Sequence, residues 1–473
     1  METGPKPVAF GQALPPLQLG YARTTAFGSI ILVYLLITFD YMLTARYVRD
    51  NLQAIHSSLS KRKSDYPLDE LLGLDEQNKA VKKEIQQLRS ERNKGSIEIS
   101  EARKAGRAVP DSKTDELAGI RKQIAELEEK IVKSGKRLDF LLWNMPNILD
   151  ESVPYGKGEE ENVEVKRVGK TERRKTPSHE EILTKLGLLD LEQAAKVSGA
   201  RFYYLKGDLA LLEQALMRFA IDFLTGKGYL LIAPPLMLKK EYYRGATALG
   251  DFEEALYRVG DTTESGSKKG LERLEEELFL VSTAEHPIAA MNADIIFSPK
   301  DMPKRYVGVS PCFRREAGSH GKDTKGIFRV HQFYKVEQFV VCRKEDSQKI
   351  FEELLSNTEE LFTALGIPYR IMNICTGEIG VVAARKYDLE AYMPAQDRYR
   401  EMASCSDCTE WQAMRLGIKY DEGERKYAHT LNNTAIATER AIVAIVENYV
   451  DESGRIRVPK ALIPYMNGKE VIG

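Results

Sequence analysis

The sequence predicts an α+β protein in which a largely antiparallel sheet flanked by helices follows a long antiparallel coiled-coil hairpin. Two observations support this fold class. Between residues 67 and 143, apolar residues recur at an alternating spacing of four and three, which is typical of paired helices. Beyond about residue 180, short β-rich runs and amphipathic helices follow one another in mixed order, with few of the strand–helix–strand units that build parallel sheets.

The composition indicates a globular protein of two or three domains. The chain has 473 residues, of which 29% are charged and 43% hydrophobic. Because the net charge is −1, a nucleic-acid contact would need a local basic patch. The five cysteines fit a reducing compartment, and the pair Cys405 and Cys408 has no second pair to complete a zinc site. We expect three parts, at residues 1–41, 42–150 and 151–473.

Residues 1–41 contain the run "AFGSIILVYLLITF", about fourteen apolar residues. A membrane-spanning helix needs roughly 20. Three interpretations compete for this segment: a membrane anchor, a targeting peptide, and an upstream extension from a misassigned start codon. The short run and the sparse basic residues favour the extension. We therefore expect a cytoplasmic protein without stable membrane association.

The hairpin is predicted from two apolar seams separated by the turn "KAGRAVPDSK". The first seam contains Leu74, Val81, Ile85, Leu88 and Ile99, and the second contains Leu117, Ile120, Ile124, Leu127, Ile131 and Leu138. Polar Asn78 and Ser134 occupy two slots of these seams. Basic residues gather towards the turn, namely Arg89, Arg92, Lys94, Arg103, Lys104 and Arg107. They form either a solvated helix face or a surface for a phosphate backbone.

The C-terminal part is predicted to alternate helices and short strands. The run "DLALLEQALMRFAIDFLTGKGY" is an amphipathic helix that leads into "YLLIAPPLML", an apolar strand interrupted by Pro234 and Pro235. Further strands are expected at residues 277–282, 304–313, 327–342, 368–375 and 397–404. The run "ATERAIVAIVENYV" is the closing helix.

The stretch "SPCFRREAGSHGKDTKGIFRVHQFYKVEQF", residues 310–339, places many charges on two strands joined by a polar loop. Residues two apart in a strand share a face, so we expect Arg314 and Glu316 to point the same way. The returning strand would place three more side chains on one face, namely Arg329, Phe333 and Glu337. Arginine matches phosphate and carboxylate oxygens, and an aromatic ring can stack on a base. The alternative is a surface sheet with cross-strand ion pairs.

This stretch resembles motif 2 of the class II aminoacyl-tRNA synthetases, in which phenylalanine, arginine, any residue and glutamate precede a loop and a returning strand. "GKGYLLIAPPLML" resembles motif 1, with Pro235 as its proline, and "LNNTAIATERAIVAIVENY" resembles motif 3, with Arg440 as its arginine. The runs "STAEHP", "KVEQF", "KYDLEAYMPAQ", "REMASCSDCTEWQAMR" and "HTLNNTAIATERA" are similar to the seryl-tRNA synthetase family. The resemblance extends from about residue 42 to the C-terminus.

The resemblance implies a serine–tRNA ligase that activates L-serine with ATP to seryl-adenylate and transfers it to tRNA(Ser), with tRNA(Sec) as a second candidate. It also implies that the hairpin arm binds the tRNA and that motif 1 forms a homodimer. Two alternatives remain: a paralogue that charges a carrier protein or serves biosynthesis without tRNA, and a coiled-coil scaffold whose C-terminal domain is inactive.

The resemblance also implies roles for individual residues. Arg314 would bridge the ATP α-phosphate and the serine carboxylate, and Arg440 would hold the γ-phosphate, as the two catalytic residues. The ATP-binding set would be Arg314, Arg315, Glu316, Arg329, Val330, Phe333, Glu401, Met402, Ala403, Ser404 and Arg440. The serine-binding set would be Thr283, Ala284, Glu285, Arg314, Glu337, Asn432 and Thr434. Glu401 and Ser404 would hold Mg²⁺, although this chain reads "EMAS" where many bacterial members read "EISS".

Such a reaction needs positioning more than acid–base chemistry. A carboxylate and a triphosphate must approach in line, and arginines with Mg²⁺ offset their repulsion. The serine carboxylate is already a nucleophile, so no base is needed. A pocket that bonds the serine hydroxyl rejects alanine by on the order of 10⁴–10⁵-fold.

Overall fold

The computed structural model describes residues 44–174, 176–248, 253–259, 277–316 and 325–473. The described residues belong to one compact unit, residues Tyr41–Gly473. The interpretation of residues 1–41, and the polar loop at residues 317–324, lie outside the described residues. Within the described ranges, no helix combines the length and apolar character that a membrane span requires.

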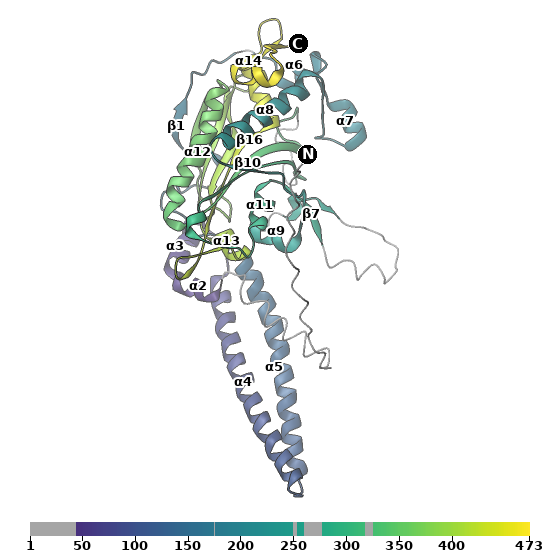
Figure 1. The fold of residues 1–473 in the computed structure, drawn as a ribbon, viewed down its shortest axis with the longest axis vertical. Coiled ribbons are helices and arrows are strands. Elements are labelled where there is room, and N and C mark those ends of the chain that lie inside the picture. Colours follow the sequence, from purple (N-terminus) through teal and green to yellow (C-terminus); the bar gives the residue numbers. More distant parts are fainter. Residues whose placement is uncertain (1–43, 175, 249–252, 260–276, 317–324) are drawn as a thin grey trace, which may run out of the picture. The chain divides into compact units, whose positions relative to one another are not determined.

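Two long helices form the predicted hairpin. The helix α4 spans Leu68–Lys104 and α5 spans Asp111–Asn144, and they lie side by side (Figure 1). They are preceded by α2 (Ala45–Asp50) and α3 (Leu52–Arg62). The turn at residues 105–110 falls inside the predicted "KAGRAVPDSK" segment. The coiled-coil prediction is confirmed.

The seam between α4 and α5 is built from the predicted residues. Val81, Ile85 and Ile124 are buried, and partly buried Leu88, Ile120, Leu127 and Ile131 pack against them. The hydroxyl of Ser134 donates a hydrogen bond to the side-chain oxygen of Asn78. The two polar slots of the seams therefore face each other, which satisfies both groups inside an apolar interface.

An eight-stranded sheet organises the remainder. Its order is β1 (Val163–Val168), β11 (Tyr369–Asn373), β12 (Arg385–Met393), β13 (Arg398–Asp407), β16 (His429–Ala437), β10 (Gln332–Cys342), β9 (Lys304–Phe313) and β4 (Leu230–Ile232). All neighbours pair antiparallel except β4 and β9, which are parallel. The predicted antiparallel α+β fold is confirmed.

The remaining elements are helices of various lengths and small strands. The helices are α6 (His179–Lys185), α7 (Leu191–Ser198), α8 (Asp208–Gly226), α9 (Lys240–Ala246), α11 (Glu285–Met291), α12 (Ser347–Ala364), α13 (Trp411–Leu416) and α14 (Thr438–Tyr449). The small strands are β2 (Leu189–Asp190), β3 (Tyr204–Leu205), β5 (Met237–Lys239), β6 (Arg258–Val259), β7 (Leu278–Leu280), β8 (Ile296–Phe297), β14 (Lys419–Asp421), β15 (Arg425–Tyr427), β17 (Ile456–Arg457) and β18 (Val471–Ile472).

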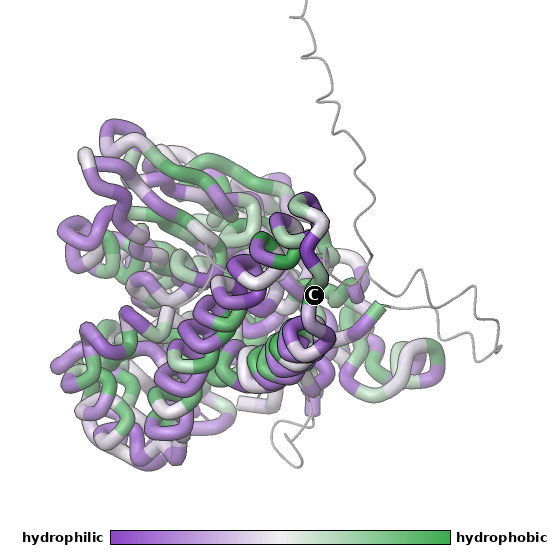
Figure 2. The backbone as a smooth tube through the Cα atoms, turned by 90° about the horizontal axis from the view of Figure 1, so that it is seen from below, coloured by the Kyte–Doolittle hydropathy of each residue, from purple (hydrophilic) through white to green (hydrophobic). Residues whose placement is uncertain are grey.

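Helices cover the two faces of the sheet differently. On one face, residues of α8, α12 and α14 share the main hydrophobic core with β10 residues Val336 and Val340. On the other face, Phe339 and Val341 pack against residues of α11 and α13. This alternation follows from the period of two along a strand. In Figure 2, hydrophobic and hydrophilic residues alternate at short intervals along the helices, as expected for amphipathic elements.

Two glycines allow the short helices to approach closely. A Cβ atom at Gly308 of β9 would lie 2.5 Å from Cδ1 of Ile288 on α11. A Cβ atom at Gly245 of α9 would lie 2.3 Å from Cδ2 of Leu416 on α13. A larger residue at Gly308 would push α11 away from the sheet, and a larger residue at Gly245 would push α9 and α13 apart.

One expected strand begins later than predicted. The strand β9 has the predicted bounds, but β10 begins at Gln332 rather than at residue 327. Arg314 therefore follows β9, and Arg329 precedes β10. The pairing between β9 and β10 ends here. The backbone N–H of Arg314 still donates to the carbonyl of His331, but the backbone N–H of His331 donates to the carbonyl of Arg201. The prediction that Arg314 and Glu316 share a strand face is wrong, since Glu316 has a left-handed φ of 49°.

Candidate active site

A cavity of about 270 Å³ lies against the sheet face that carries α9, α11 and α13. Its walls come from the turn before α11, the ends of β9 and β10, the strands β12, β13 and β16, and the start of α14. The lining residues are Ser282, Thr283, Glu285, His286, Arg314, Glu316, Phe328, Arg329, Val330, Phe333, Lys335, Glu337, Lys386, Glu401, Met402, Ala403, Ser404, Ser406, Asn432, Thr434, Ala437, Glu439 and Arg440.

Almost all predicted site residues meet in this cavity. The exceptions are Ala284 and Arg315, which are not among its lining residues. Ala284 is buried at the N-terminus of α11. Arg315 is exposed, and its backbone N–H donates to the carbonyl of Ala255. Both stand beside lining residues in the sequence, which explains why a motif-based prediction included them.

One end of the cavity is rich in guanidinium groups. The guanidinium of Arg314 lies over the ring of Phe333, 5.1 Å from its centroid. The Nε atom of Arg314 is buried and has no hydrogen-bond partner in the described part of the chain. A buried, unpaired donor is costly, so this atom is suited to an anionic ligand. Glu316 forms an ion pair with Arg329 at 2.5 Å.

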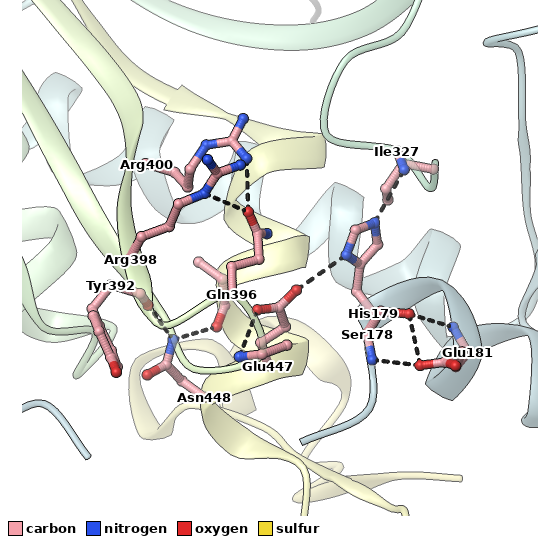
Figure 3. A network of polar contacts seen from close by, with 12 residues as sticks. Ser178, His179, Glu181, Ile327, Tyr392, Gln396, Arg398, Arg400, Glu447 and Asn448 are labelled. Carbon is pink, nitrogen blue, oxygen red and sulfur yellow. Dashed lines mark hydrogen bonds and ion pairs between the residues drawn. The ribbon is translucent and has the colours of Figure 1, made fainter. Parts of the chain in front are cut away.

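The segment that precedes β10 is held from behind by a buried histidine. The backbone N–H of Ile327 donates to Nε2 of His179, at 3.2 Å. Nε2 must therefore be the acceptor, which leaves the proton on Nδ1, 3.2 Å from a carboxylate oxygen of Glu447 (Figure 3). A Cβ atom at Gly326, which has a φ of +68°, would collide with this ring. His179 thereby fixes the approach of Phe328 and Arg329 to the cavity.

The strand β13 places the carboxylate of Glu401 near Arg440. Arg440 donates to the backbone oxygen of Glu401 at 2.9 Å and lies 3.5 Å from its carboxylate. Burial opposes ionisation of Glu401, but the charges of Arg440, Lys386 and Arg314 together hold its pKa below the usual value. This carboxylate is therefore ionised at neutral pH.

A second acidic group lies behind Glu401. The hydroxyl of Ser404 donates to Asp388 at 2.7 Å. Burial raises the pKa of Asp388 to about 7, with Glu401 adding to the rise and Lys386 opposing it. Lys386 and Asp388, on the interior strand β12, were not predicted as site residues. Within the described residues, no cluster of three acidic, histidine or cysteine side chains could hold a metal by itself.

The other end of the cavity contains a buried ionic cluster. Lys335 and Glu337, both nearly inaccessible, form an ion pair at 2.5 Å. The hydroxyl of Thr434 donates to the same carboxylate oxygen of Glu337 at 3.2 Å. Glu285 faces this pair, and burial together with the charge of Glu337 raises its pKa to about 7. Two acidic groups and one cation thus share an enclosed subsite.

The cavity thus combines guanidinium groups, which are suited to anionic oxygens, with a buried acidic subsite that is suited to a cation. In agreement, the family model of the class II tRNA synthetase core domain (G, H, P, S and T) matches residues 263–449. The fold and the cavity therefore define a class II aminoacyl-tRNA synthetase. The family model of the seryl-tRNA synthetase N-terminal domain matches residues 42–149.

Relatives specify the family further. The chain is 46% identical to the serine–tRNA ligase of Methanocella arvoryzae, over 91% of this chain and 100% of that protein. A crystal structure of seryl-tRNA synthetase from Pyrococcus horikoshii complexed with ATP matches with a TM-score of 0.80 and 44% identity, over 91% of this chain and 99% of that one. A cytoplasmic serine–tRNA ligase from Naegleria fowleri in complex with AMP matches with a TM-score of 0.76 and 37% identity, over 92% and 99%.

The chain belongs to the seryl-tRNA synthetase family. The prediction of a serine–tRNA ligase is confirmed by these relatives. The roles of single residues and the division at residues 150 and 151 stay predictions.

Proposed function

We propose that the cavity activates L-serine with ATP to seryl-adenylate, releases pyrophosphate, and transfers the seryl group to tRNA(Ser). The observation that carries this proposal is the division of the cavity: arginines at one end and a buried acidic subsite at the other. Polyphosphate and an amino-acid ammonium have these opposite requirements. The relative from Pyrococcus horikoshii was solved with ATP, which supports a nucleotide at the arginine-rich end.

In the first step, the serine carboxylate attacks the α-phosphorus and the bond to pyrophosphate breaks. The charge of Arg314 acts on Glu401 as well as on Glu285, so its unpaired Nε atom is suited to hold an oxygen of either reactant. Arg440, which donates to the backbone oxygen of Glu401, would hold the γ-phosphate. Phe333 and Glu316 would receive the adenine, and Arg329, Val330, Met402 and Ala403 would complete the ATP subsite.

Glu401 and Ser404 are the candidate Mg²⁺ ligands. Mg²⁺ commonly uses one or two carboxylates and completes its coordination with phosphate oxygens and water, so this small donor set fits. When bound, Mg²⁺ would neutralise the charge of the phosphates. Glu401 itself is kept ionised by Arg440, Lys386 and Arg314, which outweigh the effect of burial on its pKa.

Serine would bind at the acidic end. Its ammonium would lie between Glu285 and Thr283, and its hydroxyl would reach Glu337, Asn432 and Thr434. Because Glu337 is already hydrogen-bonded by Thr434, the acceptor for the hydroxyl is held in place before serine arrives. Alanine would lack the hydrogen bond from the substrate hydroxyl to this buried carboxylate, and threonine would be excluded by size.

The hairpin α4–α5 would bind tRNA(Ser) through phosphate contacts. Near its turn, Lys94, Arg103, Lys104 and Arg107 are exposed. Such contacts recognise shape more than sequence and weaken with salt. The reaction is expected in the cytoplasm, where ATP and tRNA are found together, and tRNA(Sec) is a second candidate substrate.

A homodimer would form at the edge of the sheet. The edge strand β4 and the segment after it expose Leu230, Leu231, Leu236 and Met237, the first of them by 60%. An exposed apolar edge strand is a surface that natural proteins cover. Sedimentation at micromolar concentration is expected to give a dimer. A monomer with full activity would contradict the assignment.

The test of the function is serine-dependent ATP–pyrophosphate exchange, followed by aminoacylation of bulk tRNA. The proposal predicts both activities. Exchange without charging would support the paralogue that does not use tRNA, and the absence of exchange would support the scaffold.

A further inference from the structure

The serine subsite rests on a residue that lies outside the predicted set. Gln412, on α13, is completely buried. Its amide nitrogen donates to a carboxylate oxygen of Glu285 at 2.7 Å and to the backbone carbonyl of Ala246 at 2.9 Å. Its amide oxygen accepts from the hydroxyl of Thr430 at 2.7 Å. Both N–H groups of the amide therefore donate, and its oxygen accepts.

The orientation of this amide is fixed by chemistry. The carbonyl of Ala246 can only accept a hydrogen bond, so it must face the amide nitrogen rather than the oxygen. The same nitrogen then faces Glu285. Because Ala246, Thr430 and Glu285 belong to three different elements, the amide cannot turn without breaking contacts on all of them.

We propose that Gln412 is a positioning residue of the serine subsite, which holds the carboxylate of Glu285 in the orientation that receives the substrate ammonium. This inference rests on the proposed function, in which Glu285 contacts serine. Gln412 contacts Glu285 directly but is not a lining residue of the cavity. It acts on the substrate through Glu285 alone.

The charges around Glu285 explain why it needs such support. Glu337 and Lys335 face it from β10, and Arg314 faces it from the end of β9. Burial and then the charge of Glu337 raise the pKa of Glu285 to about 7, whereas Lys335, Gln412 and Arg314 lower it. Two further titratable neighbours are neutral: burial lowers the pKa of His286 to about 3 and raises that of the Cys408 thiol well above its usual value.

The helix that carries Gln412 is anchored to the base of the arm. Arg415, one turn further along α13, is buried and donates to the carbonyls of Leu142, Trp143 and Met145, at distances from 3.0 to 3.3 Å. These three residues lie at the C-terminal end of α5. The indole of Trp411 also donates to Met145 at 2.9 Å. The position of Gln412 therefore depends on the junction between the arm and the sheet.

The sign of the pH effect follows from the hydrogen bond. A donor to the charged form lowers the pKa, so removal of the Gln412 amide raises the pKa of Glu285. Serine needs the ionised form of Glu285 for its ammonium. The activity kcat/KM for serine falls as the pH drops through this pKa, and the loss begins at a higher pH in the variant.

The experiment measures serine-dependent pyrophosphate exchange without tRNA, for wild type and Gln412→Met, between pH 6 and 9. We expect the serine KM at pH 7 to rise about ten- to hundredfold, as for a lost hydrogen bond to a charged group. The ATP KM is expected to stay within twofold, and the acid limb of kcat/KM to move to higher pH. Gln412→Glu places a second acid against Glu285 and is expected to raise the serine KM further.

Gln338→Met is the matched control. Gln338 is equally buried on β10, but its amide donates to Leu354 and Thr358 on the opposite side of the sheet. The control is expected to lower the melting temperature without changing the serine KM or the pH profile. Arg415→Lys tests the anchor, since an ammonium cannot reproduce the planar fork, and a smaller rise in serine KM is expected.

The inference is overturned if Gln412→Met keeps the wild-type serine KM and acid limb, or if it loses serine and ATP affinity in equal proportion. If Gln412→Met does not fold, the same comparison is made with Gln412→Glu, which keeps the side-chain size. Absence of serine-dependent exchange in the wild type would instead contradict the proposed function.

Discussion

The arm and the cavity both depend on charged residues, but they hold them in opposite ways. On α5, Lys133 pairs with Glu129 while 77% and 68% of the two side chains remain exposed. In the cavity, Lys335 pairs with Glu337 while 8% and 2% remain exposed. Exposed ion pairs contribute little to stability, so their residues can be substituted at low cost. A broken buried pair, by contrast, leaves an uncompensated charge. Single substitutions of charged residues should therefore have small effects on activity in the arm and large effects in the cavity.

The two regions also differ in how their residues are brought together. The arm seam joins residues within two neighbouring helices. The cavity joins Thr283, Arg314, Glu401 and Arg440 from separate elements of one sheet and its helices. A local change in the arm should leave the cavity intact, provided that the junction at α13 is kept.

The largest effect is expected from Arg314→Ala. The variant removes this guanidinium, which costs about 3 kcal/mol of transition-state stabilisation or more, so exchange should fall at least about hundredfold. Arg315→Ala is the matched neighbour, and its exposed side chain should cost far less. Near-normal exchange in Arg314→Ala would show that the motif 2 assignment is wrong.

The second largest effect is expected from shortening the arm, which should separate tRNA charging from serine activation. Replacing residues 84–128 by a short glycine linker keeps equal stumps of α4 and α5 and the base of the arm. Serine-dependent exchange should stay near the wild-type rate, while tRNA charging should fall about hundredfold or more through lost phosphate contacts. Equal loss of both activities would assign the arm a structural role.

A gentler test of the arm changes its charge alone. Reversal of Arg103, Lys104 and Arg107 to glutamate should weaken charging and reduce its salt dependence, because each lost phosphate contact lowers the slope. Lys133→Glu, in the half of α5 far from the turn, is the control. It should retain the wild-type charging rate and the wild-type salt dependence. Charging kinetics at several salt concentrations distinguish the variants.

Glu337→Ala should raise the serine requirement more than it lowers the maximal rate. The change removes an acceptor for the serine hydroxyl and leaves Lys335 buried without its partner. We expect a serine KM increase of about tenfold to hundredfold, with the ATP KM less affected. An unchanged serine KM would place the hydroxyl elsewhere in the cavity.

The smallest effect is expected in the arm seam. The double variant Asn78→Leu with Ser134→Ala replaces a buried polar pair by apolar groups, which should be neutral or stabilising by about 1 kcal/mol. Asn78→Leu alone should be close to the double variant in stability, because the hydroxyl of Ser134 can still donate to the backbone carbonyl of Lys130, at 2.9 Å. Thermal unfolding measures the difference, and a destabilised double variant would mean that the pair has a larger role.

The arm was predictable because its pattern is local. Apolar residues recur at spacings of four and three along most of α4 and α5, and the turn between them is marked by glycine and proline, so few alternatives exist. The strand β9 was predicted at its true bounds for a similar reason, since it is mostly apolar from Tyr306 to Phe313, with Ser310 as the polar exception.

The strands β12 and β16 were not among the predicted strands. Lys386, Asp388 and Glu390 of β12 interrupt the apolar pattern, as do Asn432, Asn433 and Thr434 of β16. Except for the half-buried Lys386, these polar residues are buried, because distant partners satisfy them: Arg370 donates to Glu390, and Asn433 donates to Leu354 and Thr358. A window of one strand does not contain such partners.

The site was predicted through motifs, and residues between the motifs were missed. Lys386 and Gln412 lie in runs that resembled the family as a whole but carried no residue-specific signal. Gln412 gains its role from contacts with Ala246 and Glu285, more than 120 positions away. Only the three-dimensional structure brings such residues to the subsite.

The most direct test of the central claim is a comparison of serine, alanine and threonine in ATP–pyrophosphate exchange by the wild-type protein. The buried acidic subsite predicts that serine supports exchange with a kcat/KM on the order of 10⁴–10⁵ above that of alanine, and that threonine also fails. Exchange that is equal with alanine, or absent with serine, would contradict the claim that this cavity selects and activates serine.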